Sequence, residues 1–209
     1  RNIQSFTVCF AMDYRAGEDH TISKPANYDF WRAYVPKMKP AWTGKLLDWT
    51  YSHPITLEPR HPAFHPEIAE PVKGAINLWI YRRIASKANF QPGAYQSDIT
   101  LVNWPHNDYW LGDLHTGTPA EIARHHQGGR QLSMALFYWM QTACGFKGLR
   151  LRGDLTGSAD GLAKMPYIRE SRRIRAEFTV TEQHVGVDAR SAMTGKKPPE
   201  LRAEKFADS

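Results

Sequence analysis

The sequence predicts an α+β fold, in which a mixed or antiparallel sheet carries helices on one side. Short stretches with apolar residues at alternating positions indicate strands, whereas one long segment over 119–143 indicates an amphipathic helix. These elements follow one another without the regular strand–helix–strand repeat of doubly wound folds. No G-x-G-x-x-G motif occurs, because Gly153, Gly157 and Gly161 are too widely spaced. We therefore expect the chain to lack a dinucleotide-binding Rossmann unit of its own.

The N-terminal part is expected to form a strand and then a short helix. Within residues 3–12, every second side chain from Phe6 to Met12 is apolar, which predicts a strand with one buried face. A short helix is expected over 27–34, with the side chains of 28–31 facing inward. Pro36 limits the length of this helix, because proline does not fit a helix interior.

Prolines dominate the next stretch, 53–71. Five of them exclude both a long helix and a central strand, so we expect an extended loop that wraps around the protein. Alternating apolar residues return at 76–80 and at 99–101, and they predict two more strands.

The clearest helix prediction covers residues 119–143. Thr118 and Glu121 have the spacing of a capping box, and Gly145 follows where a helix would end. The glycines at 128–129 weaken the middle of this helix, and they permit a kink or a close backbone contact. Helix and cap together make this the main helix of the predicted fold.

Strands and turns are expected after this helix. The pattern predicts a short strand at 149–152, turns over 153–161, a long strand over 167–181 and a loop at 194–199. Alternation along the long strand places Glu170 and Arg172 on the inward face, together with Ile174, Ala176, Phe178 and Val180. The same alternation places Arg169, Arg173 and Arg175 on the other face, which solvent can cover.

A buried Arg172 and Glu170 are costly unless they pair with each other or with a ligand. This cost favours a guanidinium that meets an anionic group of a substrate or cofactor. The alternative is an edge strand with a bulge, in which every charge is solvated.

Length and charge narrow the class of protein. The 209 residues suit one compact domain or a large part of a bigger protein, and the net charge is +6. Eight basic and three acidic residues over 145–175 give +5 in one segment, which favours a local anion site over a broad nucleic-acid surface. No apolar run of about 18 residues occurs, so we expect a soluble protein with no membrane span. The sequence does not indicate its cellular location. The start at Arg1, without Met or a signal-peptide pattern, leads us to expect processing or a fragment.

Several catalytic chemistries find little support. Neither His61 with His65 nor the pair at 125–126 has a third ligand at a recognisable spacing, so we expect no metal site. Cys9 lies in an apolar strand and Cys144 ends an apolar helix, which indicates buried, unreactive thiols. The absence of G-x-S-x-G argues against a serine hydrolase.

Residues 103–110, with the sequence NWPHNDYW, form a better candidate site. Aromatic walls with a few hydrogen-bonding groups are typical of small-molecule pockets. The alternative is a tight loop that caps its own turns and is anchored by tryptophan. His106 or Asp108 is the candidate acid or base. We expect these residues to lie near the substrate or cofactor: Asn103, Trp104, Asn107, Tyr109, Trp110, Arg169, Glu170, Arg172 and Arg173, with Glu170 holding a guanidinium.

Residues 167–174 have the sequence YIRESRRI and resemble the signature of a family of bacterial FAD-dependent oxidoreductases. The segment at 103–110 is similar to the NWP-x-NDYW segment of that family, and residues 3–9 resemble one of its strands. Further similar stretches precede the signature at 130–133, 138–142, 148–152 and 160–164. The sequence departs from the family pattern at 11–14 and at 37–53, which include Trp42 and Trp49, and these departures bear on the choice of substrate.

The resemblance implies an enzyme that oxidises a small organic substrate by hydride transfer to FAD. In that family a G-x-G-x-x-G unit precedes such a segment and further flavin-contacting sequence follows it. Residues 1–209 therefore resemble one substrate-side region of a larger flavoenzyme, with FAD bound mainly by flanking segments and the isolated chain inactive. The alternative is a non-catalytic module for a small ligand or carbohydrate, with Trp104, Tyr109 and Trp110 as stacking surfaces. A nucleic-acid-binding domain ranks last.

Overall fold

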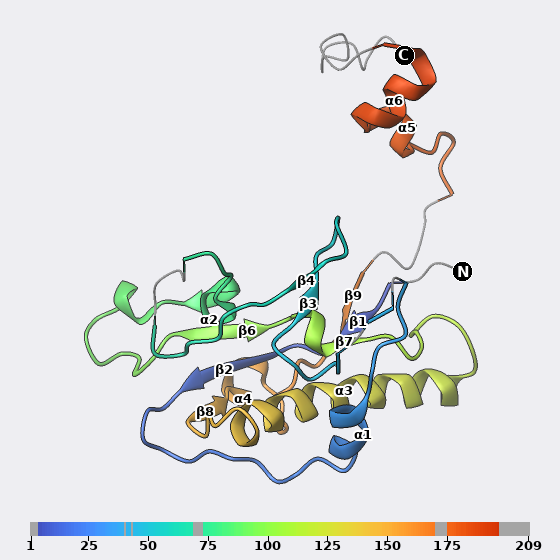
Figure 1. Ribbon diagram of the computed structural model, residues 1–209. Helices are drawn as coiled ribbons and strands as arrows, with labels where there is room; N and C mark the ends of the chain where they lie inside the picture. The colour runs from blue at the N-terminus through green and yellow to red at the C-terminus, as the bar shows by residue number, and fades with distance from the viewer. Residues whose placement is uncertain (1–3, 40, 43, 69–72, 170–174, 197–209) are drawn as a thin grey trace. The chain divides into compact units, whose positions relative to one another are not determined.

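In the computed structural model, which describes residues 4–39, 41–42, 44–68, 73–169 and 175–196, the N-terminal stretch forms two strands rather than one. They are β1 (Phe6–Thr7) and β2 (Phe10–Tyr14), with Val8 and Cys9 between them. The break separates two sheets, because β1 belongs to one of them and β2 to the other. Figure 1 shows the chain passing from one sheet to the other at this point.

All the strand pairs of the described residues are antiparallel, which confirms the predicted fold class. One sheet has the order β7-β1-β9 and a second has the order β5-β6-β2-β8, while β3 and β4 form a separate pair. The remaining strands are β3 (Tyr51–Ser52), β4 (Pro59–Arg60), β5 (Arg83–Ala85), β6 (Ile99–Val102), β7 (Asp108–Tyr109), β8 (Leu149–Leu151) and β9 (Tyr167–Ile168).

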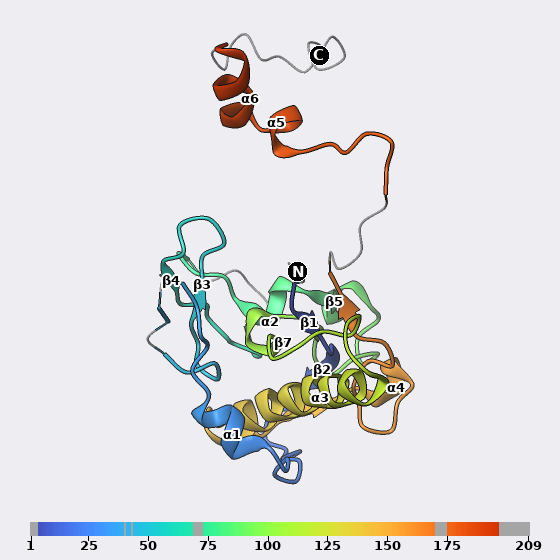
Figure 2. The ribbon, with the colours of Figure 1, turned by 90° about the vertical axis from the view of Figure 1, so that its right-hand side faces the viewer.

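The predicted main helix is confirmed as α3 (Pro119–Thr142). Its capping box is present, since Thr118 Oγ1 accepts from the amide of Glu121 at 3.3 Å, and Gly145 has a φ of 82° just beyond its end. Figures 1 and 2 show α3 running along one face of the two larger sheets. None of the helices of the described residues is both long enough and apolar enough to cross a membrane.

The core lies between α3 and the even-numbered side chains of β1 and β2. Phe6, Val8, Phe10 and Met12 are all buried there, against leucine and methionine side chains of the helix. The glycines at 128–129 allow this close packing, because a Cβ at Gly128 or Gly129 would meet Tyr109 at 2.7 Å or Phe6 at 2.6 Å. A close contact, which was one of the two expected roles of these glycines, is therefore what they provide.

The odd-numbered side chains of the same strands are buried too, so the prediction of a single buried face is wrong. Ser5, Thr7, Cys9, Ala11 and Asp13 are each less than a tenth exposed. Arginine side chains from other parts of the chain reach Thr7 and Asp13 on this second face. The alternation correctly separates the two faces, but it does not show what covers the more polar one.

Two further local predictions need correction. Residues 76–80 do not form a strand, because the side chain of Asn77 accepts from the Trp79 amide at 3.1 Å and starts the helix α2 (Leu78–Tyr81). The expected short helix is present as α1 (Tyr28–Ala33), but of its first residues Trp31 alone is buried, whereas Phe30 is half exposed. The cap by the Asn77 side chain explains why a helix forms at 78–81. The short α1 has a narrow contact with the core, which explains why few of its side chains are buried.

Over its described residues, 53–68, the proline-rich region has no long helix and no central strand, as predicted. It contributes the short pair β3-β4, in which Tyr51 lies opposite Arg60. Three further short elements lie elsewhere in the first part of the chain, namely η1 (Lys87–Asn89), η2 (Pro105–Asn107) and α4 (Gly153–Thr156), the last within the predicted turn region.

The long strand predicted over 167–181 is wrong. Only β9, at its start, pairs with a neighbour, while residues 170–174 lie outside the described residues and 175–181 form no strand. Phe178 and Val180 are 66% and 63% exposed, so they do not form the expected inward face. Alternation alone does not make a strand where no described partner strand is available.

The chain divides into two compact units, Arg1–Ser171 and Arg172–Ser209. All the sheets described above belong to the first unit. The described residues of the second unit include two short helices that the sequence patterns did not reveal, α5 (Glu182–Val185) and α6 (Val187–Thr194).

Candidate functional site

Arg169 connects the two segments that the sequence singled out. Its Nη1 donates to Thr7 Oγ1 at 3.0 Å and to the Ser5 carbonyl at 3.2 Å, and it lies 3.1 Å from Asp108 Oδ1. Its Nη2 donates to Asn103 Oδ1 at 3.3 Å. The prediction that Arg169 faces away from the protein is therefore wrong, because the side chain turns back over the sheet directly after β9.

Asp108 is the buried carboxylate of this cluster. Thr7 Oγ1 donates to Asp108 Oδ1, while the Arg169 guanidinium supplies the opposite charge. Burial raises the pKa of Asp108 above its ordinary value, and the Thr7 hydrogen bond and Arg169 oppose that rise. The guanidinium is thus held by Asp108, a role that the sequence had suggested for Glu170. Glu170, Arg172 and Arg173 lie outside the described residues.

His106, the other candidate acid or base, is almost completely buried. Burial lowers the pKa of His106 to about 4, although the backbone of Thr50 and the negative charge of Asp48 oppose this change. Within the described part of the chain, no hydrogen bond of ordinary geometry reaches either ring nitrogen. The ring lies edge-on to Trp49 and Trp104. His106 is therefore a neutral imidazole in an aromatic environment at neutral pH.

Most of the 103–110 segment is buried as framework. Asn107 Oδ1 accepts from the Trp104 amide at 2.9 Å, and Asn107 Nδ2 donates to the Val8 carbonyl and to Ser133 Oγ, each at 3.3 Å. Trp104 is fully buried and Tyr109 is 5% exposed, whereas Trp110 is 62% exposed. Of the three aromatic residues proposed as a stacking surface, only Trp110 is exposed enough to contact a sugar ring.

Two of the histidines considered as metal ligands form hydrogen bonds with hydroxyl groups. His125 Nδ1 shares a hydrogen bond with the hydroxyl of Tyr109 at 3.0 Å, and His61 Nδ1 lies 3.2 Å from Thr50 Oγ1. In the ranges that the structure describes, no three His, Cys, Asp or Glu side chains come together as a metal-binding group.

Asp13 is the centre of a second polar cluster, which the sequence patterns did not reveal. It is 1% exposed, and Arg150 binds it with Nε at 3.0 Å and Nη2 at 2.7 Å. Arg15 and Arg152 also reach Asp13 Oδ2, at 3.2 Å and 3.4 Å. Arg152 binds Asp154 in addition, at 2.6 Å. The one sequence signal that could have pointed to this cluster is the acidic residue on the less apolar face of the N-terminal strand.

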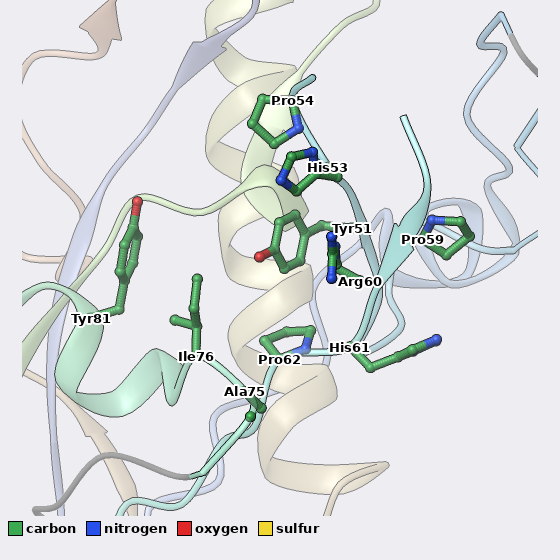
Figure 3. A pocket seen from close by; sticks show the side chains of 11 residues that line it. Tyr51, His53, Pro54, Pro59, Arg60, His61, Pro62, Ala75, Ile76 and Tyr81 are labelled. Atoms are coloured by element: carbon green, nitrogen blue, oxygen red, sulfur yellow. The ribbon is translucent and has the colours of Figure 1, made fainter. Parts of the chain in front are cut away.

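A groove of about 840 Å³ lies between the β3-β4 pair and the start of α2. Figure 3 shows Tyr51, Arg60 and His53 on one side of it and Tyr81 on the other, with Ile76 at its base. His61 points away from the other side chains in this view. The groove joins two segments, 51–62 and 74–81, and the patterns in neither segment predicted it.

The lining of the groove is apolar, aromatic and basic. It consists of Tyr51, His53, Pro54, Pro59, Arg60, His61, Pro62, Gly74, Ala75, Ile76 and Tyr81. No acidic residue belongs to this set, and Arg60 forms no ion pair with the residues that the structure describes. The arrangement suits a small ligand with an apolar body and a negative charge.

The FAD that the sequence resemblance implies needs a site for its pyrophosphate, which helix N-termini commonly provide. α3 is the longest described helix, but Glu121 Oε2 already accepts from the Thr118 amide at 2.8 Å. A carboxylate in that position repels a phosphate. The other helices of the first unit, α1, α2 and α4, have four to six residues each. The described helices of the first unit therefore do not fit the pyrophosphate of FAD at their N-termini.

Comparison with known proteins gives one result. A family model described as FAD dependent oxidoreductase matches residues 1–209. No curated protein and no solved structure matches the chain. The family match covers the whole length of the sequence, including the strands, the main helix and the signature-like segment. On this evidence, the chain belongs to the FAD-dependent oxidoreductase family.

Proposed function

We propose that this chain is the substrate-binding portion of an FAD-dependent oxidoreductase that oxidises a small organic substrate by hydride transfer. Membership of the family supports the role of a flavoprotein oxidoreductase with FAD as its cofactor. When bound, FAD supplies the two-electron acceptor that amino-acid side chains lack. The observation that carries the substrate-binding part of the proposal is the groove between β3-β4 and α2.

The groove has the dimensions and the chemistry that substrate binding needs. Its volume of about 840 Å³ lies within the range of about 300–1,000 Å³ that is typical of small-molecule sites. Two tyrosines and Ile76 offer apolar contact, while Arg60 and His53 offer polar contact. Substrate orientation and exclusion of water are the contributions that a protein makes to such a reaction.

The cluster around Arg169 has a supporting role in this proposal. Its bonds to Asp108, Thr7 and Asn103 fix the start of the 167–174 segment on the sheet. From the sequence pattern alone, we propose that Glu170, Arg172 and Arg173 lie near the substrate or near a cofactor held mainly by segments outside 1–209. Asp108 and His106 stay candidates for acid–base roles, and Trp110 for contact with a ligand.

The test uses the full-length protein that contains this chain, purified with its flavin. Substrate candidates are mixed with it without oxygen, and bleaching of the flavin absorbance reports reduction. An Ala75→Trp variant fills the groove, so we expect flavin content to be unchanged while the substrate concentration for half-maximal reduction rises at least tenfold. Leu155→Trp is the control, because Leu155 is half exposed on α4, outside the groove lining.

Two results would contradict the proposal. One is a full-length protein that binds no flavin. The other is an Ala75→Trp variant whose reduction kinetics match those of the Leu155→Trp control, because the groove would then have no part in substrate binding.

A further inference from the structure

We infer that the groove takes a small organic carboxylate with a planar, apolar body, and that Arg60 determines its specificity. The inference rests on the proposed function of the groove as the substrate site. It adds the chemical class of the ligand, for which the charge and the hydrogen-bonding state of the lining residues provide the argument.

Arg60 provides the charge for this recognition. It is exposed on the two-residue strand β4, and no carboxylate of the described residues pairs with it. This differs from Arg150 and Arg169, whose guanidiniums bind buried aspartates. A guanidinium presents parallel N–H donors that match the two oxygens of a carboxylate. Arg60 therefore has its full donor set available to a ligand.

His53 adds a neutral donor next to this charge. Its Nδ1 accepts from the amides of Ile55 and Thr56, at 3.3 Å and 3.1 Å. An Nδ1 that accepts has no proton, so the proton of the neutral imidazole lies on Nε2. Nε2–H is thus the donor that His53 offers to a ligand in the groove.

Tyr51 and Tyr81 provide the surfaces for a planar body. Figure 3 shows the two rings on opposite sides of the groove, with Ile76 at its base. Tyr81 is 51% exposed and Ile76 is 45% exposed, so both have apolar surface to cover. The Arg82 guanidinium lies 5.2 Å from the centre of the Tyr81 ring and limits the movement of that ring. A flat ligand covers more of these surfaces than a branched aliphatic one.

The charge balance favours a carboxylate over a phosphate. Arg60 is the one arginine or lysine in the lining. One positive charge balances one negative charge, whereas a phosphate monoester carries nearly two. The groove also has no helix N-terminus with free amides directed into it, since the Asn77 side chain already caps α2.

The experiment measures binding and flavin reduction separately, on the full-length protein with its flavin. Isothermal titration calorimetry with benzoate, benzamide and phenyl phosphate compares one planar body with three head groups. We expect benzoate to bind at least tenfold more tightly than either of the others. Arg60→Gln should weaken benzoate binding by 10- to 100-fold and leave benzamide binding within twofold, and Arg60→Lys should restore part of the loss.

Lys24→Gln is the control for the loss of one positive charge, because Lys24 is exposed and lies outside the groove lining. It should leave all three affinities unchanged. The inference is overturned if benzoate does not bind, if phenyl phosphate binds most tightly, or if Arg60→Gln and Lys24→Gln have equal effects. The flavin spectrum tests the proposed function independently. Binding of benzoate through Arg60 in a protein without flavin would contradict that function while the groove still recognised a carboxylate.

Discussion

Replacing Asn107 with alanine tests whether the 103–110 segment is framework. The Asn107 side chain is completely buried and links three parts of the fold. Its Oδ1 holds the Trp104 amide at 2.9 Å, and its Nδ2 reaches the Val8 carbonyl, between β1 and β2, and Ser133 Oγ of α3. A side chain with these partners stabilises the fold and has little capacity left to bind a ligand.

The expected loss follows from the three hydrogen bonds. Without Asn107 the Trp104 amide loses its partner inside the protein, which costs about 1–3 kcal/mol, and each of the other two bonds contributes about 1 kcal/mol. Val8 O keeps its bond from Ser133 Oγ at 2.6 Å, which limits the damage. We expect a loss of about 3–5 kcal/mol, which is a large part of the roughly 5–15 kcal/mol of a typical domain.

Urea unfolding followed by tryptophan fluorescence measures this loss. The midpoint should fall by about 1–2.5 M with an unchanged slope, given a slope of about 2–3 kcal/mol per M, in the upper part of the usual range because the slope increases with protein size. Ser133→Ala is the matched control. It removes the bond from Ser133 Oγ to Val8 O and the bond that Ser133 Oγ accepts from Asn107, but it leaves Asn107 to bind the Val8 carbonyl and the Trp104 amide, so about 2 kcal/mol is expected. If Asn107→Ala is no more destabilising than Ser133→Ala, or if it weakens ligand binding at full stability, the framework argument is refuted.

Three further predictions follow from burial. The folded pKa of His106 is about 4 and its ordinary value is 6.5, so the unfolded state binds more protons between these values. The free energy of unfolding should therefore fall as the pH drops from 7 to 4. The fall should exceed that of the His106→Asn variant by up to about 3 kcal/mol, and urea titrations at each pH measure both. Gly148→Ala should destabilise the protein by at least about 2 kcal/mol more than Gly44→Ala. The new Cβ at 148 would lie 2.2 Å from the Arg15 carbonyl oxygen, whereas a Cβ at 44 would have its nearest atom 3.4 Å away. Calorimetric melting will compare the two variants. Burial raises the pKa of the Cys9 thiol to about 11, so iodoacetamide should modify it only as fast as the protein opens; rapid labelling of the folded protein would contradict this.

Local signals predicted the elements whose stabilising interactions lie close together in the sequence. The helix α3 has its capping box at Thr118 and Glu121 and its terminal glycine at 145 within its own segment. The strand at 99–102 likewise has the expected alternation. For these elements neighbouring residues supply both the start signal and the buried face, so inspection of the sequence is sufficient.

Predictions failed where distant partners decide the structure. Residues 76–80 alternate like a strand, but the Asn77 side chain caps a helix there and also accepts from the His65 amide at 3.2 Å. The long strand over 167–181 was predicted by extending the alternation beyond β9, but the described residues 175–181 form no strand. Pairing across a sheet is a contact between segments, and alternation within one segment does not reveal it.

The candidate site was predictable only in part, for the same reason. The sequence singled out Arg169 and Asp108, but it gave no sign that the two side chains pair with each other. The groove was not predicted at all, because Arg60 and Tyr81 meet only after the proline-rich stretch has folded back on α2. Residues that form a site from two remote segments have no shared spacing that a motif could record.

The ion pairs of the arginines explain why the proposed anion site lies at the groove and not in the basic segment 145–175. The excess of +5 over 145–175 suggested that an anion binds there. Yet Arg150 binds the buried Asp13, and Arg169 binds a second buried carboxylate, so neither guanidinium is free to bind a ligand without breaking a pair that burial strengthens. Arg60 lies in a segment without such an excess, and it forms no ion pair within the described residues. The availability of a guanidinium thus depends on its partners in the fold, and it favours the groove as the place where an anionic substrate binds.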